Sequence, residues 1–370
     1  MEQKTPKKIE FGIADAFIVI LLCFCGVFKR FWILQEPKSP VFEEGMIFES
    51  FGLYQSKKYF VSRNSQLVNI LMFHYLSFAT YNGEYNNFIT NDDAKYTSMH
   101  YISLRTLSAG ISVSIIPLSY ILGILSGLSR FTSFFYGLYI LIDNTLDFQE
   151  VHSIYCSLSH LCVIFSQILF YLYDYRNKMR FPWAFLLVTL LAVLFDQNNF
   201  LIIICMVISR RVFLFFLFSL LFSLLIQNHV HIHMCGSQKD FISPYLLNHS
   251  EKFQIHIQNF TQPSLGATLE SAFVTYWQNS LTRFSLYPKN ILLLISLSAT
   301  CILTIHYILS GSFPMFLIQS LLSQISLSHP NSSHNIISFN YLSLIHLLSL
   351  LPNSFNSSIF LIMIVQMEIL

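Results

Sequence analysis

The sequence predicts an all-α polytopic membrane protein with about eleven transmembrane helices. Its composition is the first reason: 54% of the 370 residues are hydrophobic and 11% are charged, whereas a soluble globular chain carries about a quarter charged residues. The mean hydropathy of +0.56 is the second. The third is a series of apolar windows along the chain, each near the roughly 20 residues that one helical crossing needs.

The apolar windows define the expected crossings. A polar, basic tail precedes the first window, and no small-residue cleavage site follows it, so we expect a retained first span rather than a signal peptide. The last three windows are rich in Ser and Asn. In order, the windows are 11–29, 101–128, 131–146, 153–174, 182–196, 198–209, 211–228, 288–309, 312–328, 335–351 and 356–370.

Lysine and arginine residues predict the orientation. If the N-terminal tail is cytosolic, alternating crossings place the other basic short loops in the cytosol too, and the short loops on the opposite side have no Lys or Arg. These basic residues are Arg130, Arg176, Lys178, Arg180, Arg210 and Arg211. The expected regions are a cytosolic tail (1–10), a first transmembrane region (11–228) with a lumenal loop (30–100), a second lumenal loop (229–287) and a C-terminal transmembrane region (288–370).

Two adjacent carboxylates, Glu43 and Glu44, follow the first span. A carboxylate beside the bilayer can act as a general base, or it can be an ordinary solvated loop residue. Arg105, near the start of the second span, can bind a phosphate through its planar fork, or it can extend toward the interface. Asp143 and Asn144 close the third expected span, where they can shape a site or cap a helix.

The alternating residues His229, His231, His233 and Cys235 would share one face of a strand and could bind a metal there. On a helix they would scatter around its circumference. We expect no metal site and no cofactor. The sequence has no basic patch, so we expect no nucleic acid among the partners.

An ordered set of motifs resembles the protein O-mannosyltransferase family, the dolichyl-phosphate-mannose–protein mannosyltransferases. Residues 37–120 carry VFEEGMIFESFGLYQSKKYF, VSRNSQLVNIL, TYNGEYNNF and MHYISLRTLSAGISVSIIPLSY in the order and spacing of that family. Further on, ILIDNTLDFQE, RFPWAFLLVTLLAV and GSQKDFISP resemble later family segments. The resemblance covers about residues 11–245.

The chain also departs from the family pattern. The family's Asp-Glu reads Glu43-Glu44, and its Asp-x-His-Pro-Pro stretch reads SRNSQ at residues 62–66. Asn69 and Val151 stand where the family has basic residues. The loop 229–287 is too short for the three-part β-trefoil (MIR) domain that the family usually carries there. The chain therefore resembles a short, divergent member.

The resemblance implies a GT-C-type glycosyltransferase of the endoplasmic reticulum membrane, with 11–228 as its catalytic region. Such an enzyme transfers mannose from dolichyl-phosphate-mannose to Ser or Thr hydroxyls of proteins, with inversion at the sugar. Glu43 would be the general base, Glu44 would position the acceptor or hold the loop, and Arg105 would bind the departing phosphate. Asp143 and Asn144 would shape the donor site.

Other functions remain open at this point. Glu in place of Asp adds one methylene, and a misplacement of about 1 Å can cost on the order of 100-fold in rate. The chain could therefore be a weak or inactive partner subunit that forms a dimer with an active relative. It could also transport lipid-linked sugars, or be an unrelated polytopic protein.

Overall fold

The computed structural model describes residues 11–35, 42–57, 60, 65–79, 100–143, 146, 150–176, 183–196, 199–235, 299, 302–307 and 342. The regular elements in these residues are α-helices, in agreement with the all-α prediction. The main helices are α1 (Ile13–Trp32), α2 (Phe42–Gln55), α3 (Gln66–Phe78), α4 (His100–Leu125), α5 (Arg130–Ile142), α7 (Ile154–Arg176), α8 (Trp183–Phe195), α9 (Asn199–Ser209) and α10 (Phe213–Cys235).

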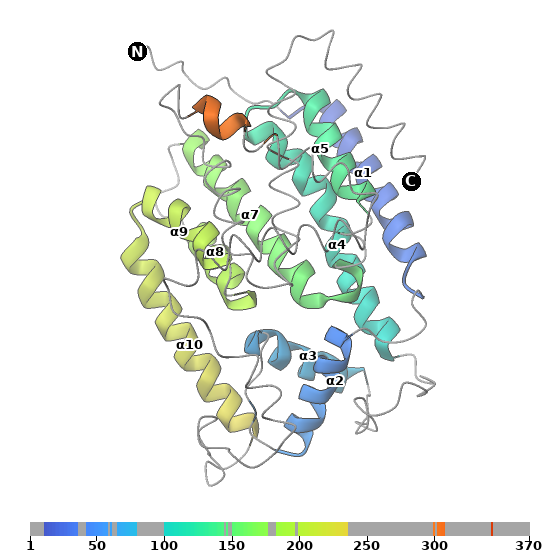
Figure 1. Cartoon of the computed structure of the whole chain (residues 1–370), viewed down its shortest axis with the longest axis vertical. Coiled ribbons are helices and arrows are strands. Elements are labelled where there is room, and N and C mark those ends of the chain that lie inside the picture. Colours follow the sequence, from blue (N-terminus) through green and yellow to red (C-terminus); the bar gives the residue numbers. More distant parts are fainter. Residues whose placement is uncertain are drawn as a thin grey trace.

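Helix α4 lies at the centre of the bundle, where it packs against α1, α5 and α7 (Figure 1). Helix α7 in turn packs against α8, and α9 follows on the same side. Helices α2 and α3 form a separate layer below the bundle in Figure 1, near the first turn of α4. We call this the α2 end of the molecule. Helices α1 and α5 end on this side of the bundle, and helices α4 and α7 begin on it.

The sequence determines several helix boundaries locally. Ser129 precedes α5 and its hydroxyl accepts a hydrogen bond from the Thr132 backbone N–H at 3.2 Å, and Ser65 caps α3 in the same way through Val68 at 3.3 Å. These bonds satisfy backbone donors that have no partner within the helix.

The short helices α2 and α3 are an addition to what the sequence predicted, which was only a lumenal loop over 30–100. Their apolar side chains join a buried cluster with the bundle. Ile47, Phe48 and Phe51 of α2 are each 3% exposed, and Leu76 of α3 is fully buried. Burial of this apolar face stabilises both helices against the bundle although each is too short to be stable alone.

The predicted count of eleven crossings is not confirmed. Within the described ranges, three helices are long and apolar enough to span a membrane: Tyr101–Leu125, Ile154–Leu172 and Phe213–Cys235. Helices α5 and α8 are apolar but shorter. The windows at 312–328, 356–370, most of 288–309 and all but Leu342 of 335–351 lie outside the described residues. The GT-C arrangement is likewise not confirmed.

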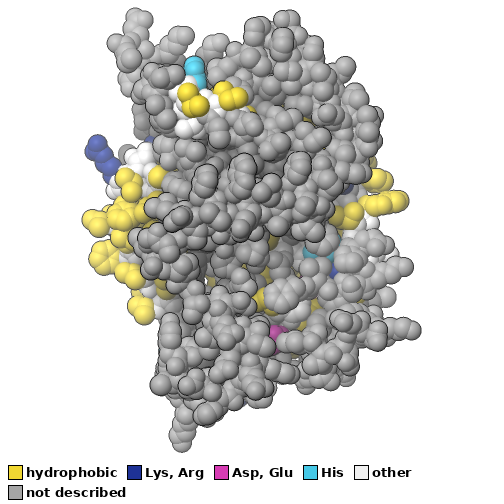
Figure 2. Space-filling view, viewed as in Figure 1, with side chains coloured by type: hydrophobic (Ala, Val, Ile, Leu, Met, Phe, Trp, Pro, Cys, Tyr) yellow, Lys and Arg dark blue, Asp and Glu magenta, His cyan; other side chains and the backbone are white. Residues whose placement is uncertain are grey.

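Helix α10 also differs from its predicted window, 211–228, because it continues to Cys235. Its exposed hydrophobic residues form a flank on the left of Figure 2, the side on which α10 lies in Figure 1. These residues include Leu214, Phe215, Phe218, Leu221, Phe222 and Leu225. Only its two ends contribute buried side chains, from Phe216, His231 and Cys235.

Helices α4 and α5 pack closely at Gly123. A Cβ atom on Gly123 would lie 2.9 Å from Ser133 Oγ and 3.2 Å from Ser133 Cα. Because a backbone atom cannot move aside as a side-chain end does, we expect Gly123→Ala to lower the free energy of unfolding by about 1–3 kcal/mol. The measurement is thermal or denaturant unfolding of the purified protein in nanodiscs.

Gly110 provides the matched control on the same helix. A Cβ atom there would meet nothing within 4 Å, so Gly110→Ala should instead stabilise the helix by roughly 0.5–1 kcal/mol. Equal effects of the two substitutions would contradict the close α4–α5 approach.

Candidate active site

A buried ion pair joins α2 to α4 at the α2 end. Arg105 Nε lies 2.6 Å from Glu44 Oε1, and Arg105 Nη2 lies 3.0 Å from Glu44 Oε2. The Glu44 residue is 1% exposed and Arg105 is 0% exposed. This two-bond geometry between a guanidinium and a carboxylate is among the stronger polar contacts in proteins.

Further contacts fix the Arg105 guanidinium. Its Nη1 donates to the backbone carbonyl of Leu34 at 3.0 Å, and its Cζ lies 4.6 Å from the centre of the Tyr101 ring. Glu44 lies in the first turn of α2, where the helix dipole favours a negative charge. The structure therefore brings together two of the residues that the sequence singled out.

The other predicted site residues, Glu43, Asp143 and Asn144, are described only in part by the structure. Glu43 lies in the first turn of α2, but its side chain is outside the described part of the structure, as is the whole of Asn144. Asp143 ends α5, is 6% exposed and accepts a hydrogen bond from the Leu146 backbone N–H at 2.8 Å. Asp143 is the C-cap residue of α5, the alternative that the sequence left open, and its bond to Leu146 is a local turn contact.

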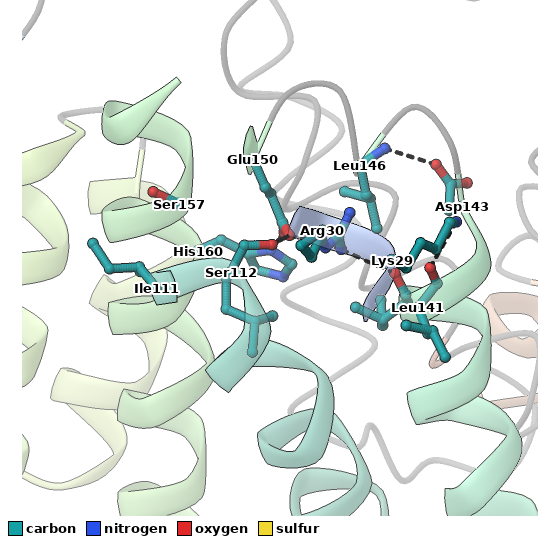
Figure 3. A network of polar contacts seen from close by, with 12 residues as sticks. Lys29, Arg30, Ile111, Ser112, Leu141, Asp143, Leu146, Glu150, Ser157 and His160 are labelled. Atoms are coloured by element: carbon teal, nitrogen blue, oxygen red, sulfur yellow. Dashed lines mark hydrogen bonds and ion pairs between the residues drawn. The ribbon is translucent and has the colours of Figure 1, made fainter. Parts of the chain in front are cut away.

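A second buried charge cluster lies where the end of α1 meets α4 and α7, and its residues were not among the predicted site residues (Figure 3). Arg30 Nη2, from the end of α1, lies 3.0 Å from Glu150 Oε2. His160 Nδ1 lies 2.5 Å from Glu150 Oε1, and Ser112 donates to Glu150 Oε2 at 2.6 Å. All four residues are 0% exposed. Since a carboxylate only accepts, the His160 Nδ1 atom carries the hydrogen.

This environment determines the charge of Glu150. Burial by itself would raise the pKa of the Glu150 carboxyl. The nearby Arg30 charge and the hydrogen bonds from His160 and Ser112 outweigh burial, so the pKa of Glu150 lies below its usual value. Glu150 is therefore an anion at neutral pH.

Lys29 and Arg30, in the last turn of α1, donate hydrogen bonds to backbone carbonyls at the end of α5. Lys29 Nζ donates to the carbonyls of Leu141 and Ile142, both at 2.8 Å, and Arg30 donates to Ile140 at 3.3 Å. The last carbonyls of a helix lack partners within the helix and carry partial negative charge. Lys29 and Arg30 thus supply hydrogen-bond donors to the free carbonyls at the end of α5.

One face of α4 connects the two clusters. Arg105, Ser108 and Ser112 are spaced by three and four residues, which places them on one side of a helix over about 10 Å. Ser108 donates to the Glu150 carbonyl and lies 3.1 Å from the Ser157 hydroxyl. This spacing of polar residues was visible in the sequence and could have marked α4 as the lining of a polar interior.

The histidines at the end of α10 lie on a helix. His231 is fully buried while His229 and His233 are exposed, so the three do not converge. In the described ranges, no group of three or more His, Cys, Asp or Glu side chains is placed to hold a metal ion.

Comparison with known proteins bears on this arrangement. No curated protein matches the chain. A family model described as dolichyl-phosphate-mannose-protein mannosyltransferase matches residues 20–234, which is more than half of the chain and includes Glu44, Arg105 and Glu150. The chain belongs to the dolichyl-phosphate-mannose-protein mannosyltransferase family.

Proposed function

We propose that this protein transfers mannose from dolichyl-phosphate-mannose to Ser or Thr hydroxyls of proteins, with inversion at the sugar carbon. The observation that carries the proposal is the buried Glu44–Arg105 pair within the matched family region. A guanidinium at the end of a helical bundle suits a lipid-linked phosphate, because the lipid chain can lie among the helices while its charged phosphate meets a fixed cation.

Arg105 is assigned to the phosphate of the donor. Glu44 holds the guanidinium by two bonds and neutralises it while the donor is absent. On binding, the phosphate shares or displaces this carboxylate. Negative charge grows on the phosphate as its bond to mannose breaks, and a prepositioned cation stabilises that charge.

Glu43 is assigned to the acceptor. It is the neighbour of Glu44 in α2, and Glu44 is already committed to Arg105. The hydroxyl oxygen of Ser or Thr attacks C1 of mannose, the C1–O bond to the phosphate breaks, and dolichyl phosphate leaves. Glu43 takes the hydroxyl proton as general base.

We place the reaction at the membrane of the endoplasmic reticulum. The α2 end faces the lumen of the endoplasmic reticulum, and the helices cross its membrane several times. Asp143 and Asn144 contribute to the donor side of the site. A related subunit is the expected partner in a dimer, and no cofactor is required.

Replacement of the base should abolish transfer. We expect Glu43→Gln to lower the rate of mannosyl transfer by about 10²–10⁴-fold, the typical contribution of a general base. The assay uses purified protein in nanodiscs, dolichyl-phosphate-mannose and a Ser/Thr-rich peptide. Glu49→Gln is the matched control, because Glu49 lies on the same helix and is exposed.

Two results would contradict the proposal. Equal losses in the two variants would remove Glu43 from the base role. Transfer seen only with a co-expressed relative, and indifferent to Glu43→Gln, would make this chain the non-catalytic subunit of a pair.

A further inference from the structure

We infer that His231, acting through Tyr54, is a positioning residue that fixes α2 and with it the carboxylates of the candidate active site. This inference rests on the proposed function for its effect on the reaction. Its structural basis is a buried contact between the end of α10 and the end of α2, nearly 180 residues apart in sequence.

The His231 ring is fully buried and both of its nitrogens are hydrogen bonded. Nε2 lies 2.8 Å from the Phe60 carbonyl, and Nδ1 lies 2.8 Å from the Tyr54 hydroxyl. A carbonyl only accepts, so Nε2 carries the hydrogen and Nδ1 accepts from Tyr54. A single neutral tautomer thus satisfies both bonds.

Aromatic packing holds this contact in place. The His231 ring stands edge-on to Tyr54 and to Phe60, with centroid distances of 5.4 and 5.0 Å. Tyr54 also packs against Phe73 of α3 at 5.3 Å. Burial raises the pKa of the Tyr54 hydroxyl, so it remains a donor at neutral pH. We call His231, Tyr54 and Phe60 the α10 latch.

The α10 latch and the ion pair hold opposite ends of one helix. Glu44 binds Arg105 at the first turn of α2, and Tyr54 binds His231 at its last turn. The two residues are separated by about 15 Å along the helix axis. With both ends fixed, α2 has a defined tilt, and its first turn presents its carboxylates at a defined place. Release of the latch leaves α2 held at the Arg105 end and by apolar packing.

The mildest test is Tyr54→Phe, which removes one hydroxyl and keeps the ring. Cys235 is a native reporter, since it is 3% exposed and its sulfur lies 3.7 Å from His231 Nε2. We expect Tyr54→Phe to increase maleimide labelling of Cys235 about 10-fold, as the loss of one buried hydrogen bond allows. Labelling is read per cysteine by mass spectrometry, with the buried Cys156 and Cys162 unchanged.

A second reporter tests whether release of the α10 latch moves the first turns of α2. It does not depend on mannosyl transfer. Met46 lies in α2 two residues beyond Glu44 and is half-buried. In a Met46→Cys background, Tyr54→Phe should raise labelling at position 46 several-fold. Faster labelling of Cys235 with no change at position 46 would overturn the inference, because the latch would then open without moving α2.

The kinetic readout separates positioning from general loss of structure. We expect Tyr54→Phe to lower kcat of mannosyl transfer about 10-fold with KM for the donor unchanged within about two-fold. His231→Gln, which keeps one donor and one acceptor, should retain more activity than His231→Phe. An unchanged kcat in Tyr54→Phe would overturn the positioning role.

Tyr120→Phe is the matched control. The Tyr120 hydroxyl is also buried and donates to Asp15 at 2.6 Å, but it lies at the opposite end of the bundle. Loss of the Tyr120 hydroxyl should leave the maleimide labelling of Cys235 and of position 46 unchanged, and should leave kcat unchanged. If wild-type protein shows no transfer under any condition, the proposed function fails while the labelling of position 46 still decides the inference.

Discussion

Arg105→Met should destabilise the protein by about 3–5 kcal/mol, because removal of one partner leaves a buried charge uncompensated. The charge left behind is Glu44, which is 1% exposed and receives two bonds from Arg105. The same substitution should lower mannosyl transfer by at least about 10²–10³-fold through the loss of charge stabilisation at the phosphate. Unfolding in nanodiscs and initial rates measure the two effects separately.

A double variant distinguishes stability from chemistry. Glu44→Gln with Arg105→Met removes both charges, and neutral replacement of a buried pair is often nearly neutral for stability. We therefore expect the double variant to recover most of the lost stability and none of the lost transfer. Recovery of transfer along with stability would show that Arg105 acts only on the fold.

The second large effect is expected at Glu150. Glu150→Gln removes the carboxylate that pairs with the fully buried Arg30 and should cost about 3–5 kcal/mol in the free energy of unfolding. Arg30→Met combined with Glu150→Gln should restore much of that loss. If the single and double variants are equally unstable, the ion pair is not what stabilises this part of the bundle.

The stability that Glu150 contributes should decrease as the pH falls. The pKa of Glu150 lies below its usual value in the folded chain, so its stabilisation is present at neutral pH and is lost as the pH falls through the folded value. The unfolded carboxyl has a pKa of about 4.3. The difference in Tm between wild type and Glu150→Gln should therefore narrow below about pH 4. A constant difference from pH 7 to pH 3 would contradict the assignment of the charge.

Apolar runs in the sequence were sufficient to predict helices α7 and α8. The window 182–196 became α8, Trp183–Phe195, and the window 153–174 became α7, Ile154–Arg176. Both runs are apolar with helix-forming residues, so neighbouring residues alone indicate a helix. The family resemblance, which depends on ordered local motifs, was confirmed over residues 20–234.

Other elements depended on contacts that local patterns do not contain. The polar end of α10 looked like the start of a loop, yet it stays helical where His231 meets Tyr54 and Phe60. Helices α2 and α3 lay within a segment read as a loop, and they are stabilised by apolar packing against the bundle. Their stability comes from tertiary burial, which composition along the chain does not reveal.

The sequence by itself determined that this is a helical membrane protein of the mannosyltransferase family with Glu43, Glu44 and Arg105 as candidates. Only the tertiary structure decided that Glu44 neutralises Arg105, and that Arg30 and His160 meet Glu150. The physical reason is distance along the chain. Arg30 and Glu150 are 120 residues apart, so the energy that makes each buried charge tolerable exists only once the helices have packed.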